Sequence, residues 1–145
     1  MSGVEQQSLF SREEEARLFH DAGRQGFFSL LTQSADGGKD QESYRLSDMA
    51  FVLEHLDCKR DTWISQAEFS TTNRRAVNLA RVGLLFADLD TYKTPWAAGR
   101  SPDALVQSVH SFCDGEGVPP PSLMVFSGRG LQVKWLLEGA LPRDA

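Results

Sequence analysis

Residues 83–90 read GLLFADLD, and this apolar run with two acidic residues decides how the rest of the chain is interpreted. Side chains alternate along a β-strand, so Asp88 and Asp90 point to one side while Ala87 and Leu89 point to the other. Two neighbouring carboxylates repel each other unless a cation lies between them. Because Mg²⁺ is often bound by one or two carboxylates together with substrate phosphates, the pair predicts half of a metal site for phosphate chemistry.

A second motif lies closer to the C-terminus. Two β-like runs, SLMVF at residues 122–126 and LQVKWLL at residues 131–137, flank the sequence SGRG at residues 127–130, and this pattern predicts a hairpin. Glycines let the backbone approach a ligand closely, and their N–H groups can bind an anion. Arg129 and Lys134 add positive charge. Together, the acidic strand and the basic, glycine-rich hairpin predict a site for a metal ion and a nucleotide.

Length and composition favour one soluble domain. A chain of 145 residues is long enough to bury its own core. No run approaches the roughly 18 apolar residues of a membrane span, and the polar N-terminus resembles neither a signal peptide nor a transit peptide, so we expect no membrane partner. The two cysteines, Cys58 and Cys113, have no metal-binding spacing, which disfavours a zinc site or a disulfide scaffold. The expected compartment is the reducing cytoplasm.

The net charge of −5 counts against a nucleic-acid partner, which usually meets a basic surface. The distribution of charge matters more than the sum. Acidic residues gather in the N-terminal third, whereas several basic residues lie nearer the proposed site in sequence: Arg74, Arg75, Arg81, Lys93, Arg100, Arg129 and Lys134. The sequence therefore leaves room for a local basic groove.

The first half of the chain predicts alternating helices and strands. Residues 1–10 are expected to be disordered, and Ser11 with Glu14 forms a capping-box pattern that predicts a helix over residues 12–22. Ser47 is the expected cap of a second helix. The remaining expected elements are a strand at 27–33, an exposed loop at 34–42, a helix at 48–55, an extended segment at 63–69 and a helix at 73–82.

The second half predicts a strand, a helix and the hairpin. Residues 91–100 are expected to form a loop, and Ser101 followed by Pro102 predicts the start of the helix. A right-handed crossover would place the hairpin beside the acidic strand in one sheet, so that the two motifs face each other. The sequence ends soon after the last apolar run without a closing element, and we expect a fragment of a larger protein.

The segments LFADLD at residues 85–90 and FSGRGLQVKW at residues 126–135 resemble the archaeo-eukaryotic primase superfamily, most closely the primase-type replication proteins of plasmids and mobile elements. In that superfamily an Asp-x-Asp strand binds two divalent metals, and a Ser/Gly turn leading to a His binds the nucleotide phosphates. A third acidic residue on a later strand completes the metal site. The resemblance implies an α/β (α+β) fold, in which one catalytic domain at residues 11–145 combines an N-terminal α/β unit (about 11–82) with an RRM-like unit (about 83–145) truncated at its C-terminal end.

The resemblance also assigns roles to individual residues. Asp88 and Asp90 become the catalytic and metal-binding pair for Mg²⁺ or Mn²⁺. Gln132 stands where many members have His, so positive charge would come from Arg129 or Lys134, and the third carboxylate has no counterpart before the chain ends. The residues expected to bind the nucleotide are Ser127, Gly128, Arg129, Gly130, Gln132 and Lys134, and those expected to follow the template backbone, on charge and position alone, are Arg74 and Arg75.

Three functional classes remain open from the sequence. The first is a replication primase or primase-polymerase, a nucleotidyltransferase whose partners are a single-stranded DNA template and nucleoside triphosphates. The second is another Asp-x-Asp phosphate-transfer enzyme; Tyr92 disfavours the haloacid-dehalogenase type, and glycosyltransferases would not predict the hairpin. The third is a non-catalytic replication module that binds nucleic acid or a replicative helicase.

Overall fold

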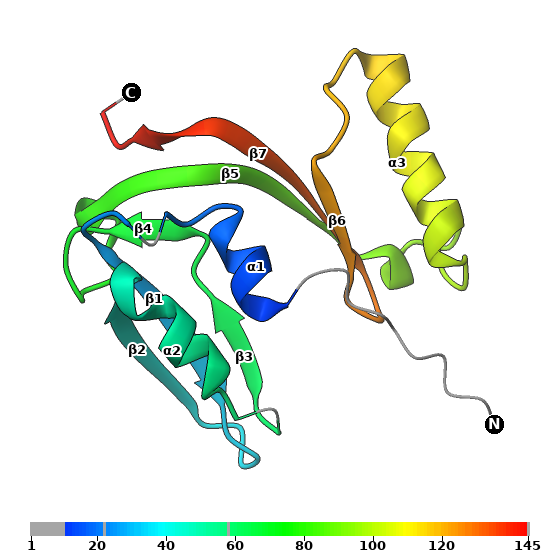
Figure 1. Ribbon diagram of the computed structural model, residues 1–145. Coiled ribbons are helices and arrows are strands. Elements are labelled where there is room, and N and C mark those ends of the chain that lie inside the picture. Colours follow the sequence, from blue (N-terminus) through cyan, green and yellow to red (C-terminus); the bar gives the residue numbers. More distant parts are fainter. Residues whose placement is uncertain (1–10, 22, 58, 145) are drawn as a thin grey trace. The chain divides into compact units, whose positions relative to one another are not determined.

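The computed structural model describes residues 11–21, 23–57 and 59–144, and the protein is a mixed α/β chain built on an antiparallel sheet (Figure 1). The strands are hydrogen-bonded in the order β2-β1-β4-β5-β7-β6, and β3 also pairs with β1. The helices are α1 (Arg12–Arg17), α2 (Met49–Glu54) and α3 (Pro102–Glu116), with short 3₁₀ turns at Leu46–Asp48, Ala76–Asn78 and Thr91–Lys93. The strands are β1 (Phe27–Gln33), β2 (Lys39–Arg45), β3 (Asp61–Ile64), β4 (Ala67–Phe69), β5 (Leu79–Leu89), β6 (Leu123–Phe126) and β7 (Leu131–Pro142).

The chain divides into two compact units, and the strands β5 and β7 each run through both. The first unit contains the residues up to 83 and those from 140 onward, and the second contains residues 84–139. That the two units together form one primase-like domain stays a prediction. Among the described residues, no helix combines the length and the apolar character needed to span a bilayer.

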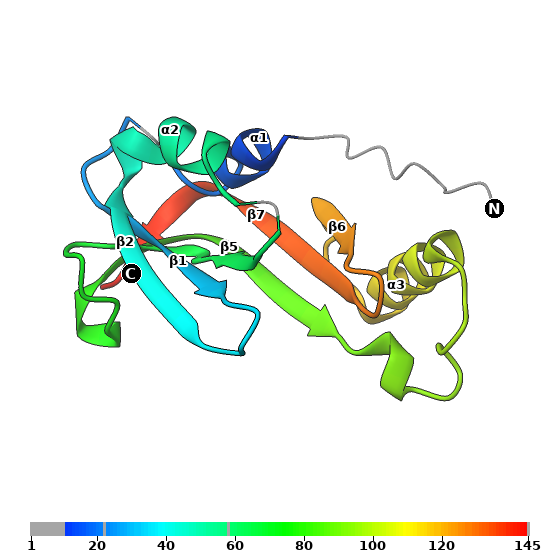
Figure 2. The same cartoon turned by 90° about the horizontal axis from the view of Figure 1, so that it is seen from below.

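In the first unit, β1 is the central strand. It pairs antiparallel with β2, β3 and β4, and the strand predicted at residues 27–33 is confirmed. The helices α1 and α2 lie beside each other on one face of these strands (Figures 1 and 2). Phe28, Leu46 and Met49 are completely buried and form the core of this unit. The predicted capping box is also confirmed, because the Ser11 hydroxyl accepts a hydrogen bond from the Glu14 N–H and the Glu14 carboxylate accepts one from the Ser11 N–H.

Two predictions for the first unit are wrong because strand pairing overrides local sequence preference. Residues 34–42 are not a simple loop: a tight turn, in which the Ser34 N–H donates to the Gly38 carbonyl at 2.8 Å, leads into β2 from Lys39. This strand is largely exposed, so its polar composition resembles that of a loop. Residues 73–82 are not a helix either, because β5 begins at Leu79 and pairs with β4 through Ala67 opposite Val82.

Smaller boundaries also differ from those predicted. The first helix ends at Arg17, and the extended segment at 63–69 is two strands, β3 and β4. Ser47 does not cap the second helix; its hydroxyl donates to the side chain of Asp48, and no side chain caps α2. In the case of Ser47, the hydroxyl that was expected to cap the helix instead forms a hydrogen bond with the neighbouring Asp48 side chain.

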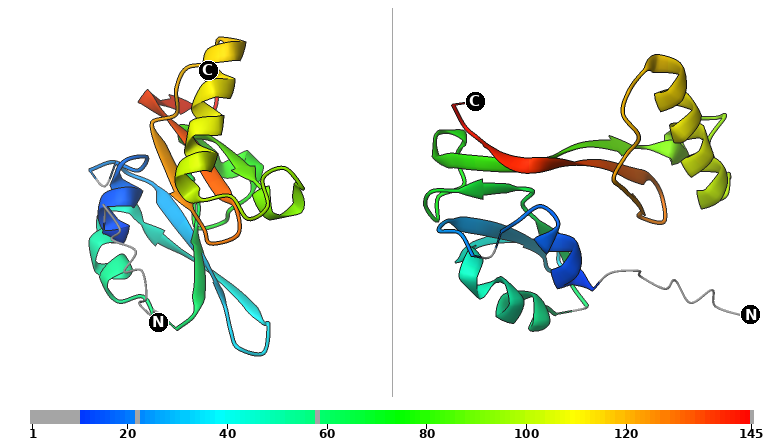
Figure 3. Two further views of the ribbon diagram at one scale, coloured as in Figure 1. Left: turned by 90° about the vertical axis from the view of Figure 1, so that its right-hand side faces the viewer. Right: turned by 45° about the horizontal axis from the view of Figure 1, so that its top comes forward.

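In the second unit, α3 packs against the strands of the hairpin (Figures 1 and 3). The helix begins as predicted, with the Ser101 hydroxyl accepting a hydrogen bond from the Ala104 N–H at 3.3 Å and Pro102 in the first turn. Leu105 contributes to a buried core with Leu131 and Val133 of β7. The predicted hairpin is confirmed, since β6 pairs antiparallel with β7, and β7 lies next to β5 as the crossover predicts.

The burial of neighbouring leucines on β5 provides a test of this fold. Leu84 is 1% exposed and Leu85 is 59% exposed, as expected when consecutive strand residues point to opposite faces. We predict that Leu84→Ala lowers the free energy of unfolding by about 2–5 kcal/mol. The matched change Leu85→Ala should alter it by less than about 0.5 kcal/mol. Urea unfolding followed by circular dichroism measures both, and equal losses would contradict the assigned faces.

Candidate active site

The acidic strand and the hairpin turn meet at a close backbone contact. A Cβ atom added at Gly130 would lie 2.6 Å from the carbonyl oxygen of Leu89 and 3.8 Å from the Cα atom of Asp90. No side chain fits at the first of these distances, so only glycine allows the start of β7 to lie against the end of β5. This contact brings together the two motifs that the sequence separates.

A hydrogen bond fixes the same junction from the other strand. The Thr91 hydroxyl, directly after the acidic pair, donates to the carbonyl of Arg129 at 3.1 Å. Within the turn, the Ser127 N–H donates to the Gly130 carbonyl at 3.0 Å, and Gly128 has a φ of 87°, a conformation that favours glycine. The turn is therefore closed internally and attached to the segment that follows Asp90.

The turn has two N–H groups available for an anion. The Gly130 N–H is occupied, because it donates to the Ser127 hydroxyl at 3.2 Å. In the part of the chain that the structure describes, the N–H groups of Gly128 and Arg129 donate to no other group. Both residues are exposed, so these two N–H groups and the Arg129 guanidinium can meet a phosphate from solvent.

Lys93 pairs with one of the two carboxylates, that of Asp90. Asp88 and Asp90 are both exposed, and the Lys93 ammonium forms an ion pair with the Asp90 carboxylate. The hydrogen bond to Asp90, and after it that to Tyr92, raises the pKa of the Lys93 ammonium above its ordinary value. The ammonium also lies 5.2 Å from the centre of the Tyr92 ring. Lys93 is therefore positively charged at neutral pH and neutralises one of the two carboxylates.

Sequence reasoning did not include Lys93 in the site, although a signal was present. The 3₁₀ turn Thr91–Lys93 follows Asp90, and such a turn places side chains three residues apart on the same side. The order Asp-x-x-Lys after the acidic strand is the pattern that would have revealed the pair.

The carboxylates fit a metal ion that is shared with a substrate. Within residues 11–21, 23–57 and 59–144, no cluster of three or more histidine, cysteine or acidic side chains is arranged to hold a metal. Two exposed carboxylates do suit Mg²⁺ or Mn²⁺, which take oxygen ligands and commonly complete their shell with water and substrate phosphates. Asp88 and Asp90 are the residues that would hold such an ion.

The remaining predicted site residues lie in different surroundings. Gln132 and Lys134 alternate along β7 with Leu131 and Val133, which face the core. Gln132 is half-buried, whereas Lys134 is only 4% exposed and already interacts with another part of the chain. Arg129 is consequently the exposed cation of the hairpin.

Arg74 and Arg75, the residues expected to follow the template, belong to the first unit, whereas the carboxylates and the hairpin turn belong to the second. Both arginines are exposed. The guanidinium of Arg74 donates to the Gln41 side chain at 3.4 Å. Their role in binding nucleic acid stays a prediction.

Comparison with known proteins gives one distant similarity. A curated protein of Clostridium perfringens, described as a replication protein, is 28% identical over 109 residues, which cover 74% of this chain. The chain spans about a quarter of that relative, since the match covers 25% of its length. No protein-family model matches the chain, and no solved structure matches it.

The contact at Gly130 can be tested by adding a methyl group. We predict that Gly130→Ala lowers the free energy of unfolding by about 1–3 kcal/mol, because the new Cβ collides with the Leu89 carbonyl. Gly115→Ala is the control: it lies in α3, where a Cβ meets nothing within 4 Å, and it should be neutral or slightly stabilising. Chemical unfolding measures both variants, and a neutral Gly130→Ala would disprove the close approach.

The competition between Lys93 and a metal ion gives a second prediction. Lys93→Met removes the cation that neutralises Asp90, so the affinity for Mn²⁺ should rise by about fivefold. Titration calorimetry with Mn²⁺ measures the change, and Lys59→Met, an exposed lysine of the first unit, should leave the affinity unaltered. Unchanged or weaker Mn²⁺ binding in Lys93→Met would show that the lysine does not compete for this site.

Proposed function

We propose that this chain is part of a DNA replication primase or primase-polymerase, a metal-dependent nucleotidyltransferase that makes primers on a single-stranded DNA template for a plasmid or mobile element. One arrangement carries the proposal: the Gly130–Leu89 contact and the Thr91–Arg129 hydrogen bond hold the glycine-rich turn against a strand with two exposed carboxylates. This combination suits a reaction on the phosphates of a metal-bound nucleotide.

The similarity to the replication protein of Clostridium perfringens supports a role in replication in general. The finer proposal of primer synthesis depends on the arrangement of the two motifs and on their resemblance to those of archaeo-eukaryotic primases. The RRM-like character of the second unit and the two-metal site belong to this finer proposal.

The residues of the site have separate tasks in this proposal. Asp88 and Asp90 would hold Mg²⁺ or Mn²⁺, which when bound would supply positive charge for the phosphates and lower the pKa of the attacking 3′-hydroxyl. The N–H groups of Gly128 and Arg129 and the Arg129 guanidinium bind the outer phosphates of the incoming nucleotide. Gln132 donates a hydrogen bond to a phosphate oxygen in the position where a histidine is common.

In this proposal Lys93 competes with the metal ion for the Asp90 carboxylate. Its ammonium pairs with Asp90, and a divalent ion held by Asp88 and Asp90 would compete with it for that carboxylate. This ion pair neutralises Asp90, and a divalent ion would offset the charge of both carboxylates, which limits the repulsion between them.

A non-catalytic module that binds nucleic acid is the second candidate. Gln132 in place of histidine and the burial of Lys134 favour it, because both reduce the positive charge available to a triphosphate. In that case the hairpin turn would bind the phosphates of a nucleic acid rather than those of a substrate.

Primer synthesis tests the first candidate directly. The full protein is incubated with single-stranded DNA, labelled nucleoside triphosphates and Mg²⁺ or Mn²⁺, and short products are resolved on a gel. Asp88→Ala and Asp90→Ala should each reduce synthesis by at least about a hundredfold, because each removes a metal ligand. Asp114→Ala, which removes an exposed carboxylate from α3, should leave synthesis unchanged.

Two outcomes separate the candidates. Products from the wild type and Asp114→Ala, but not from the two site variants, would support the primase. Synthesis that survives both Asp88→Ala and Asp90→Ala would exclude this carboxylate pair as its metal site. Absence of products from the wild type together with retained binding of single-stranded DNA would favour the non-catalytic module.

A further inference from the structure

The first unit contains a polar cavity of about 800 Å³ whose charged lining residues are all arginines. Arg24, Arg45 and Arg81 line it, together with Ser47, Ser70 and the main chain near Gly26. This composition contrasts with the whole chain, which carries a net charge of −5. We call this feature the arginine cavity.

Three separate segments supply the arginines, so the fold rather than one basic run creates the cavity. Arg24 precedes β1, Arg45 ends β2 and Arg81 lies on β5. Strand pairing sets two of these positions, since Arg45 lies opposite Phe27 of β1 and Arg81 lies opposite Glu68 of β4. Sequence reasoning could not group them because they are distant along the chain.

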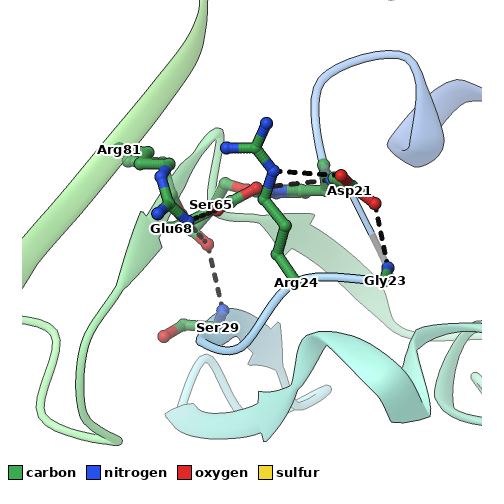
Figure 4. A network of polar contacts seen from close by, with 9 residues as sticks. Asp21, Gly23, Arg24, Ser29, Ser65, Glu68 and Arg81 are labelled. Atoms are coloured by element: carbon green, nitrogen blue, oxygen red, sulfur yellow. Dashed lines mark hydrogen bonds and ion pairs between the residues drawn. The ribbon is translucent and has the colours of Figure 1, made fainter. Parts of the chain in front are cut away.

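Two of the arginines are held by carboxylates from the unit's own residues (Figure 4). The Arg24 Nε donates to Asp21 at 3.0 Å, and the Arg81 guanidinium lies 3.9 Å from the carboxylate of Glu68. Hydrogen bonds from the Gly23 N–H and from Arg24, with a contribution from the charge of Arg81, lower the pKa of Asp21. Asp21 therefore stays ionised and orients the arginine beside it.

Glu68 is part of a buried polar network that fixes the wall of the cavity. It is 2% exposed, its Oε1 lies 3.6 Å from His20 Nδ1, and the other imidazole nitrogen of His20 lies 2.6 Å from the Ser65 carbonyl. Among the described residues, no group donates a hydrogen bond to the Glu68 Oε2 atom, which forms an ionic contact with Arg81. The buried Glu68 carboxylate therefore orients the Arg81 guanidinium, which itself remains partly exposed.

Arg45 differs from the other two because its charge is not balanced. It is exposed, and no carboxylate in the described ranges pairs with it. The cavity therefore presents three guanidinium groups with only two nearby acids, Asp21 and Glu68. Guanidinium groups bind phosphate through two parallel hydrogen bonds, and serine hydroxyls and main-chain N–H groups are common additional phosphate contacts.

We propose that the arginine cavity binds the phosphate backbone of single-stranded DNA, an inference that rests on the proposed role in replication. A volume of about 800 Å³ is within the range of small-molecule sites, so it accommodates about one nucleotide and its phosphates. A free nucleotide offers the same phosphate chemistry. The strand is favoured because cations contributed by three segments suit a chain of successive phosphates better than one terminal triphosphate.

Arg45→Gln is the test variant, because Arg45 forms no ion pair with the residues that the structure describes and its exposed position should leave folding intact. Binding of a fluorescent single-stranded oligonucleotide is measured by anisotropy at several salt concentrations. We expect about tenfold weaker binding and a salt dependence of log K that is smaller by about 0.7, the contribution of one phosphate contact on a single strand. Arg45→Lys, which retains the charge, should recover much of the affinity.

The control is Lys39→Gln, which removes one positive charge from the other end of the same strand, β2, outside the cavity. It should bind the oligonucleotide like the wild type. A parallel titration with ATP identifies the source of the phosphate: Arg45→Gln should weaken oligonucleotide binding much more than ATP binding. Equal losses for ATP and the oligonucleotide would overturn the proposal in favour of a nucleotide site.

Other results would also overturn it: no binding of single-stranded DNA by the wild type, or an Arg45→Gln variant with unaltered affinity and salt dependence. The outcome is separable from that of primer synthesis. Asp88→Ala should abolish synthesis and retain oligonucleotide binding, whereas Arg45→Gln should weaken that binding. If the wild-type protein makes no primers and the Arg45→Gln variant binds the oligonucleotide more weakly than the wild type, the primase proposal is disproved and the arginine-cavity proposal is supported.

Discussion

The candidate active site depends on one steric constraint, the absence of a side chain at Gly130. This absence lets the start of β7 lie against the carbonyl of Leu89, and the Thr91 hydroxyl then reaches Arg129 across the same junction. The acidic strand and the glycine-rich turn are thereby fixed next to each other by a backbone contact and one side-chain hydrogen bond. A site assembled in this way is organised before any ligand arrives, which reduces the entropic cost of binding.

Local charge, rather than net charge, connects the two proposals. In the second unit, Lys93 neutralises Asp90 and marks the position that a divalent ion would take. In the first unit, buried Glu68 and ionised Asp21 hold two arginines while Arg45 remains unbalanced. An acidic chain can therefore contain a cation site and a phosphate site, provided that its own residues keep each cluster organised.

The sequence predicted those elements whose signals are local. The strand at 27–33, the hairpin after residue 122 and the helix capped by Ser101 all have their cause within a few residues. The predictions of a loop at residues 34–42, where β2 lies, and of a helix at residues 73–82 were wrong. In both segments, pairing with another strand decides the structure, and the local composition is misleading. Long-range pairing is a property of the folded chain, and a single sequence does not display it.

The same division applies to the candidate site. The meeting of the acidic strand and the turn followed from the topological rule for crossovers. The sequence pattern Asp-x-x-Lys indicates the ion pair between Asp90 and Lys93, but the sequence analysis did not use it. The burial of Lys134 depends on packing that no local pattern encodes.

The most direct test of the central claim is the broadening of backbone amide NMR signals by Mn²⁺ in the ¹⁵N-labelled chain. The account predicts that the signals of Asp88–Asp90 and of Gly128–Gly130 broaden together at low Mn²⁺, whereas broadening confined to the acidic strand, with the turn unaffected, would contradict a shared metal and phosphate site.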